Sequence, residues 1–165
     1  MMKTTTANLS TPTERKLAIE QTCLRLLARR EHSRRELLDK LALRGFNRDE
    51  AEPVIDQMAG QNWQSEQRFA ECYIRQRINN GYGPMRIRYE LQQRGIDQAD
   101  LDAQVLQEVG SWEQLALDVY QRKYDSLTKL TASEWQKRSR FLQQRGFSGE
   151  TIKRVFAELK LKLSR

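Results

Sequence analysis

The sequence is poor in the residue types on which many catalytic and metal-binding sites depend. Its 165 residues include only two cysteines, Cys23 and Cys72, and one histidine, His32. Two cysteines are too few for a disulfide framework or a cysteine-based zinc finger, and one histidine excludes chemistry that needs a histidine pair. We interpret both cysteines as buried packing residues and His32 as a loop or capping residue, and we expect no metal site.

Glycine and proline are also scarce, with eight and three residues, and alternating runs of Val, Ile and Thr are missing. A β-sandwich needs both features, so this class of fold is excluded. No stretch approaches the roughly 18–20 consecutive apolar residues of a membrane span. With 38% hydrophobic and 31% charged residues, the composition favours helices that each bury one narrow stripe.

Two further absences bear on localisation and activity. Residues 1–12 are rich in Thr and contain no apolar segment of a secretory signal, so we expect a disordered N-terminal tail and a cytoplasmic protein. The sequence contains no nucleophile elbow, paired-histidine motif or acidic metal loop, and its Gly-Tyr-Gly-Pro stretch at 81–84 is interpreted as a turn between helices. We therefore expect no enzymatic activity, no catalytic residue and no cofactor.

Positive charge is abundant and unevenly distributed. The formal net charge is +7, and Arg outnumbers Lys by 20 to 9. Residues 1–96 carry a net +5, residues 97–121 carry six acids and no Lys or Arg, and residues 122–165 carry a net +8. Such an excess is typical of a surface that binds a polyanion, and equally of a basic face that only keeps the protein soluble.

The chain contains an internal repeat of about fifty residues. An Arg-Gly pair, preceded by Leu and followed by an apolar residue, recurs with its glycine at Gly45, Gly95 and Gly146. Glycine ends helices readily because it adopts the left-handed conformation, and the preceding Arg favours the helix C-terminus. The polar residues that follow this apolar residue, at positions 47, 97 and 148, are predicted N-caps of the next helix.

Helix starts and apolar stripes complete each repeat. Ser33 and the Ser133–Gln136 pair are predicted N-caps, and Pro84 occupies the first position of a helix. Earlier amphipathic helices are predicted near 13–30, 65–79 and 111–124. The sequence therefore predicts an all-α fold of three tandem three-helix repeats, at 13–62, 63–109 and 110–161. Because such thin units share packing surfaces, we expect them to form an elongated, curved array.

Basic residues fall in three clusters, which are the candidate contact sites. Arginine suits this role because its guanidinium pairs with phosphate or carboxylate through two hydrogen bonds. Arg86 and Glu90 are spaced for a helix ion pair, and the acids of 97–121 are expected to neutralise part of the basic charge. The candidates are Arg25, Arg29, Arg30, Arg34, Arg35, Arg75, Arg77, Tyr82, Arg86, Arg88, Arg94, Lys137, Arg138, Arg140 and Arg145.

Three segments of the chain resemble the RecX family of regulatory proteins. The most specific is Gly81–Ile96, which follows Arg68-Phe69-Ala70; His32–Leu41 and Arg140–Phe147 are similar to the family's opening and closing motifs. The resemblance covers roughly residues 15–160. It implies a bacterial protein, built from three three-helix repeats, that binds the RecA–DNA filament in its helical groove.

The resemblance also implies an activity. Family members limit filament extension and suppress ATP hydrolysis, strand exchange and the co-protease activity behind the SOS response. The expected partners are thus the RecA filament and, more weakly, single- and double-stranded DNA alone, with no membrane partner and a monomeric protein. Two alternatives stay open: a stand-alone nucleic-acid-binding protein, and a helical scaffold for another acidic protein.

Overall fold

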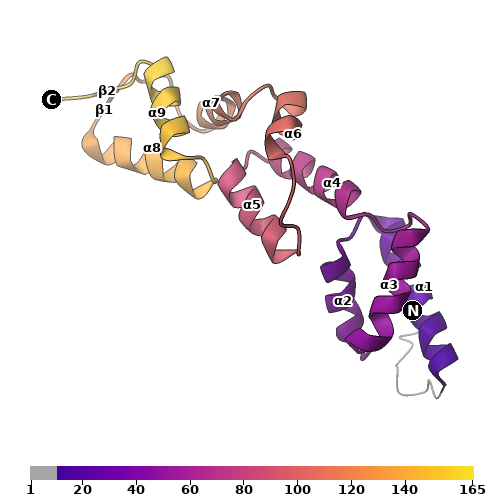
Figure 1. Cartoon of the computed structure of the whole chain (residues 1–165). Helices are drawn as coiled ribbons and strands as arrows, with labels where there is room; N and C mark the ends of the chain where they lie inside the picture. The colour runs from indigo at the N-terminus through magenta and orange to yellow at the C-terminus, as the bar shows by residue number, and fades with distance from the viewer. Residues whose placement is uncertain (1–10) are drawn as a thin grey trace. The chain divides into compact units, whose positions relative to one another are not determined.

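The computed structural model describes residues 11–165, and most of this part of the chain is helical (Figure 1). In chain order they are α1 Pro12–Arg29, α2 Arg34–Ala42, α3 Arg48–Gly60, α4 Glu66–Asn79, α5 Pro84–Gln93, α6 Leu101–Glu108, α7 Trp112–Lys123, α8 Ala132–Gln144 and α9 Gly149–Glu158. The predicted all-α fold is confirmed, with helices in three successive sets of three. The predicted boundaries of the repeats stay a prediction.

The described residues divide into two compact units. The first contains residues 11–72 together with Gln93–Ile96, and the second contains Tyr73–Gln92 together with Asp97–Arg165. Residues 1–10 of the predicted tail lie outside the described residues. The last two residues of that tail form the start of the first helix instead, because Thr11 is the N-cap of α1 and Pro12 is its first residue.

In the first unit, α1, α2 and α3 each begin at a capping box. The side chains of Thr11, Ser33 and Asn47 each accept a hydrogen bond from the backbone N–H of a glutamate three residues later, and that glutamate bonds back to the cap. The predictions for Ser33 and Asn47 are confirmed. The helices enclose an apolar core made of Ile19, Cys23, Leu26, Leu37, Leu41, Phe46, Ala51, Val54, Ile55 and Met58.

The three repeated glycines all have positive φ, as the helix-end motif predicts. The values are +85° at Gly45, +80° at Gly95 and +100° at Gly146. After each glycine the following residue, Phe46, Ile96 or Phe147, is buried. The turn therefore reverses the chain and also contributes an apolar side chain to the core.

Two predicted N-caps are wrong. We expected Asp97 to cap a helix, but α6 begins at Leu101, where Asp100 accepts the Ala103 N–H at 2.9 Å. The helix starts here because Leu101 is the first apolar side chain after Ile96 that is buried in the core.

Ser133 is the second such case, because it lies inside α8 rather than at its cap. The helix begins at Ala132, and the Thr131 hydroxyl accepts the Glu134 N–H at 3.2 Å. The preceding residue, Leu130, is buried and fixes the direction in which the chain enters the helix.

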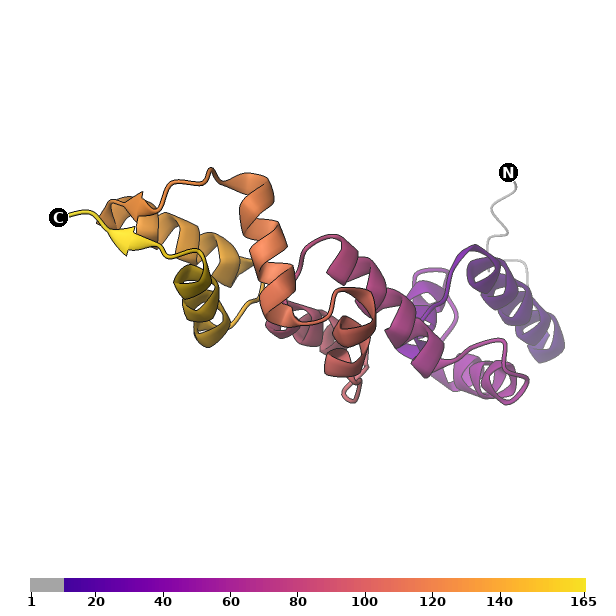
Figure 2. The same cartoon turned by 90° about the horizontal axis from the view of Figure 1, so that it is seen from above.

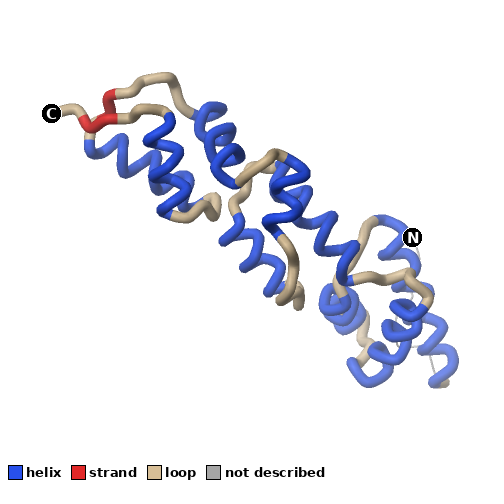
Figure 3. The backbone as a smooth tube through the Cα atoms, turned by 45° about the horizontal axis from the view of Figure 1, so that its top comes forward, coloured by secondary structure: helices blue, strands red, loops and turns tan. Residues whose placement is uncertain are grey.

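The sequence did not predict the short strand pair near the C-terminus. Strand β1 (Lys129–Leu130) pairs in parallel with β2 (Lys162–Leu163), next to α8 (Figures 2 and 3). The Lys162 N–H donates to the Thr128 carbonyl at 2.7 Å and the Ser164 N–H to the Leu130 carbonyl at 2.8 Å. The pair thus attaches the end of the chain to the third helix set.

The two cysteines differ, contrary to the prediction. Cys23 lies on α1 and is fully buried in the core of the first unit, and burial raises the pKa of its thiol to about 11. Cys72 is exposed, so it is not a packing residue. On α4 the buried positions are Phe69, Ala70, Ile74 and Ile78, and Cys72 lies outside this stripe.

Within the second unit, a close backbone contact joins the turn before α5 to the turn after α8. The Gly83 N–H donates to the Arg145 carbonyl at 2.7 Å, and the Met85 N–H donates to the Gly146 carbonyl at 3.0 Å. A Cβ atom on Gly83 would lie 2.5 Å from the Gly146 carbonyl carbon, and one on Gly146 would lie 2.5 Å from the Arg86 Cβ. Both positions therefore require glycine.

Replacing Gly83 with alanine tests this contact. We expect Gly83→Ala to lower the free energy of unfolding by about 1–3 kcal/mol, because the two turns must separate to admit the methyl group. Gly149→Ala is the matched control, since a Cβ there meets nothing within 4 Å, and it should change stability by less than about 0.5 kcal/mol. Urea unfolding measures both, and equal stabilities of the two variants would contradict the contact.

Candidate functional site

Three candidate arginines surround the ring of Tyr82 in the second unit. Their guanidinium carbons lie 3.9 Å (Arg77), 4.4 Å (Arg86) and 4.8 Å (Arg145) from the ring centroid. These distances are typical of cation–π contacts. The sequence placed Tyr82 at the tip of a turn as a contact candidate, whereas in the structure it is half-buried and organises these arginines.

Glu90 neutralises part of this cluster. One carboxylate oxygen accepts hydrogen bonds from Arg77 at 2.7 Å and Arg86 at 3.1 Å, and the other accepts from the Tyr73 hydroxyl at 2.7 Å. Burial alone would raise the pKa of Glu90, but these three hydrogen bonds outweigh it and hold the pKa below its usual range. The predicted Arg86–Glu90 pair is confirmed as one part of a larger network.

Arg145 joins the cluster from the third helix set. Its guanidinium donates to the Asn80 carbonyl at 2.9 Å, and Arg86 donates in return to the Gln144 carbonyl at 3.3 Å. Both bonds run alongside the Gly83–Gly146 backbone contact. Arg86 and Arg145 therefore support the junction between the second and third helix sets.

Arg138 is buried, with 4% of its surface exposed. It donates to the Tyr120 hydroxyl at 2.8 Å, to Asp125 at 3.2 Å and to Glu134 at 3.2 Å. Burial alone would lower its pKa, but these hydrogen bonds raise it above the usual range for arginine. Arg138 thus belongs to the interior of the third helix set and offers no open contact surface.

Other candidates are engaged by acids of their own unit. Arg30 pairs with Glu36 at 2.7 Å, Arg34 with Asp56 at 2.6 Å, and Arg75 with Glu108 at 2.9 Å. Arg94 is half-buried and also has a partner.

The acidic segment 97–121 supplies two of the carboxylates that engage arginines. Glu108 accepts from Arg75, and Glu113 lies 3.1 Å from Arg154. The expectation that this segment neutralises part of the basic charge is therefore confirmed.

A smaller set of candidates stays open to solvent. Arg29, Arg35, Arg88 and Arg140 are exposed, and their side chains form no hydrogen bond or ion pair with any residue between 11 and 165. Arg25 makes one long hydrogen bond, 3.4 Å, to Thr22, and Lys137 lies 3.8 Å from Glu134. Each helix set thus presents at least one arginine that is available to a partner.

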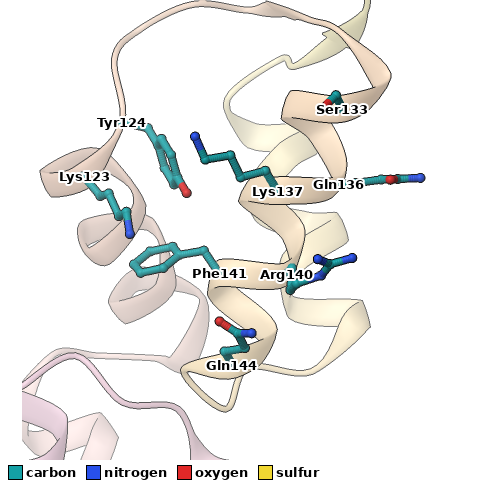
Figure 4. A pocket seen from close by; sticks show the side chains of 8 residues that line it. All are labelled: Lys123, Tyr124, Ser133, Gln136, Lys137, Arg140, Phe141 and Gln144. Carbon is teal, nitrogen blue, oxygen red and sulfur yellow. The ribbon is translucent and has the colours of Figure 1, made fainter.

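Sequence reasoning missed Lys123, Tyr124 and Phe141, which line a pocket with Lys137 and Arg140 between the end of α7 and α8 (Figure 4). A signal was present, because Lys123-Tyr124 and Arg140-Phe141 each place a cation beside an aromatic residue. Because the two dipeptides are 17 residues apart, the sequence alone does not show that they line the same pocket.

His32 is buried in the loop between α1 and α2, where its Nδ1 lies 3.0 Å from the Arg30 carbonyl oxygen. Burial lowers its pKa, so the ring is neutral at pH 7. Across residues 11–165, no group of three His, Cys, Asp or Glu side chains is placed to hold a metal ion. In the same part of the chain, no helix is long and apolar enough to span a membrane.

Replacing Glu90 with glutamine tests the hydrogen-bond network around this carboxylate. The pKa of Glu90 is lower in the folded protein than in the unfolded chain. The Glu90 carboxylate therefore stabilises the fold fully above the unfolded pKa of about 4.3, and this stabilisation is lost as the pH falls through the folded pKa. We expect Glu90→Gln to lower the free energy of unfolding by about 1–3 kcal/mol at pH 7. The difference from the parent protein should shrink as the pH falls below about 4.

Urea unfolding at pH 7 and pH 2.5 measures this difference. Glu158→Gln is the control, because this exposed glutamate makes no side-chain hydrogen bond to another described residue. A Glu90→Gln penalty that is the same at both pH values would contradict the role of the carboxylate charge.

Comparison with protein families identifies all three helix sets. The first three-helix domain of RecX matches residues 21–58, the second matches residues 65–103 and the third matches residues 112–156. The three matches occur in the family order, and each lies within one of the predicted repeats.

Individual relatives give the same result. The chain is 42% identical to the Regulatory protein RecX of Legionella pneumophila (strain Corby), over 83% of this chain and 91% of the relative. It is 42% identical to the Regulatory protein RecX of Pseudomonas fluorescens (strain SBW25), over 86% and 91%.

A crystal structure of RecX from Lactobacillus salivarius has a similar fold, with a TM-score of 0.70 at 21% identity over 89% of this chain and 97% of that one. Another crystal structure, of regulatory protein RecX, also gives 0.70, at 22% identity over 87% and 73%. With three family domains matched in order and relatives above 40% identity over most of their length, the chain belongs to the RecX family of regulatory proteins.

Proposed function

We propose that this protein binds the filament that RecA forms on DNA and inhibits its activities: ATP hydrolysis, strand exchange and co-protease function. It does so by lying in the filament groove and limiting extension, and so modulates DNA repair and the SOS response in the cytoplasm. Membership of the RecX family supports the proposal, because the relatives are named regulatory proteins. No cofactor or catalytic group enters the mechanism.

One observation carries the proposal beyond the family name: the open arginines occur in every helix set. Arg35 lies on α2, Arg88 on α5 and Arg140 on α8, which are the second helices of the three sets. A filament is a repeating acidic lattice of DNA phosphates and protein carboxylates. Several weak contacts distributed along one chain add up to stable binding to such a lattice, because each contact raises the effective concentration of the next.

In this proposal the protein inhibits RecA by bridging neighbouring protomers of the filament. A chain that contacts successive RecA protomers at several points resists the rearrangement that ATP turnover requires, and it obstructs the addition of the next protomer. Arginines already engaged by Glu36, Asp56, Glu90 or Glu108 contribute less to this binding, because a new contact must first displace an existing one.

Charge reversal of the open arginines tests the proposal. We expect the parent protein to inhibit RecA ATPase on single-stranded DNA at or below equimolar concentration. The triple variant Arg35→Glu, Arg88→Glu and Arg140→Glu should need about tenfold more protein for half inhibition, which corresponds to about 1.4 kcal/mol.

The control makes the same change in net charge at other exposed sites. Lys16→Glu, Lys129→Glu and Lys162→Glu change side chains that make no hydrogen bond or ion pair to the rest of the described chain. This variant should shift half inhibition by less than about threefold. Absence of inhibition by the parent protein, or equal losses in both triple variants, would contradict the proposal.

The same preparation distinguishes the alternatives. Equal affinity for bare DNA and for the filament, with a steep dependence on salt, would favour a stand-alone nucleic-acid-binding protein. Absence of binding to DNA and absence of any effect on RecA would favour a scaffold for another acidic protein.

A further inference from the structure

The pocket between the end of α7 and α8 has a volume of about 340 Å³ (Figure 4). This lies near the lower end of the range of about 300–1,000 Å³ in which small-molecule sites are found. All of its residues belong to the second unit, and most come from α8. The lining consists of Lys123, Tyr124, Ser133, Gln136, Lys137, Arg140, Phe141 and Gln144.

The wall of the pocket carries three cations and no carboxylate. Lys123 comes from the last turn of α7, and Lys137 and Arg140 come from α8. The one acid on α8, Glu134, is engaged by the buried Arg138 at 3.2 Å, and its contact to Lys137 is long, at 3.8 Å. Asp125, which follows Tyr124 in the chain, is also engaged by Arg138, at 3.2 Å. The pocket is therefore positively charged and suits an anionic group.

Two aromatic rings lie beside these cations. Tyr124 and Phe141 pack edge to face, with centroids 5.6 Å apart and an interplanar angle of 83°. The Lys123 ammonium lies 4.1 Å from the Phe141 centroid. Figure 4 shows the Lys137 side chain extending toward Tyr124, while Gln136 and Arg140 extend from α8 in a different direction.

From this arrangement we propose that the pocket holds one unpaired nucleotide of single-stranded DNA. Lys123 and Lys137 bind its phosphate, and the base packs against the ring of Phe141 or Tyr124. An ammonium group binds phosphate more strongly than it binds an aromatic face, so an arriving phosphate draws Lys123 away from Phe141 and uncovers part of the ring for the base. The guanidinium of Arg145 stays 5.4 Å from the ring centroid. The inference rests on the proposed function and deepens it, since it assigns DNA, rather than RecA, to this face of the third helix set.

The combination of groups favours a nucleotide over an acidic peptide. A peptide carboxylate needs only the cations, whereas this lining also contains two rings and, on the side of Phe141, the amide of Gln144. Stacking on aromatic rings next to cations is the usual way in which proteins hold single strands, and amides bond to the edges of bases. We expect the pocket to bind all four bases alike, because an aromatic ring stacks with every base.

The experiment uses the full chain and a fluorescein-labelled oligodeoxythymidine of twelve nucleotides, with no RecA present. Fluorescence anisotropy at several salt concentrations gives the affinity and its salt dependence. We expect Lys123→Ala/Lys137→Ala to weaken binding by about tenfold, and to reduce the slope of log K against log salt by about 0.7 for each phosphate that the variant no longer neutralises. Lys123→Arg/Lys137→Arg should retain most of the affinity.

The matched control is Lys153→Ala/Lys162→Ala, which removes two exposed lysines of the third helix set that do not line the pocket. It should weaken binding by less than about threefold. Equal losses in the two double variants would overturn the proposal, because they would indicate a general basic surface. Absence of binding by the parent protein would overturn it as well.

A second measurement locates the base directly. An oligonucleotide that contains 5-bromodeoxyuridine, crosslinked by light to the parent protein, should attach to a peptide that contains Tyr124 or Phe141. Crosslinks confined to other peptides, or displacement of the oligonucleotide by an equal concentration of a glutamate-rich peptide, would overturn the assignment. Since RecA is absent from both assays, a failure here is distinct from a failure to inhibit the filament.

Discussion

The second unit depends on a backbone contact that only glycine permits. The Gly83 and Met85 N–H groups donate to the carbonyls of Arg145 and Gly146, at a distance that leaves no room for a Cβ atom on Gly83 or Gly146. This contact brings the turn before α5 against the turn after α8. It also places Arg145 over the Tyr82 ring, so the packing of two three-helix sets and the arrangement of the arginine cluster have one origin.

The arginines of the chain divide into four kinds, one of which is held in ion pairs by acids of its own unit, as Arg30 is by Glu36. Arg138 is buried and holds the third helix set together. Arg77, Arg86 and Arg145 surround Tyr82 and stabilise the junction. Others, such as Arg88, make no side-chain hydrogen bond or ion pair within residues 11–165 and stay available to a polyanion. Net charge alone does not separate these roles, because it counts a buried arginine and an open one equally.

Local features were predictable from the sequence, and features that depend on distant residues were not. The glycine turns, the caps at Ser33 and Asn47 and the start of α5 follow from the residues beside them. The caps expected at Asp97 and Ser133 are wrong because burial of Leu101 and Leu130 decides where those helices begin. The burial of Arg138, the pocket and the fit of Gly83 against Gly146 arise from residues 13 to 63 positions apart, which no local pattern encodes.

Hydrogen exchange at the Gly83 and Met85 amides tests the central contact most directly, since both N–H groups lie at the start of α5, where an isolated helix leaves them open to water. The structure predicts that both exchange as slowly as amides in the middle of α5 and α8, because each donates to a carbonyl of the opposite turn. Exchange of both amides at the rate of an open loop, while the middle of the helices stays protected, would contradict the account.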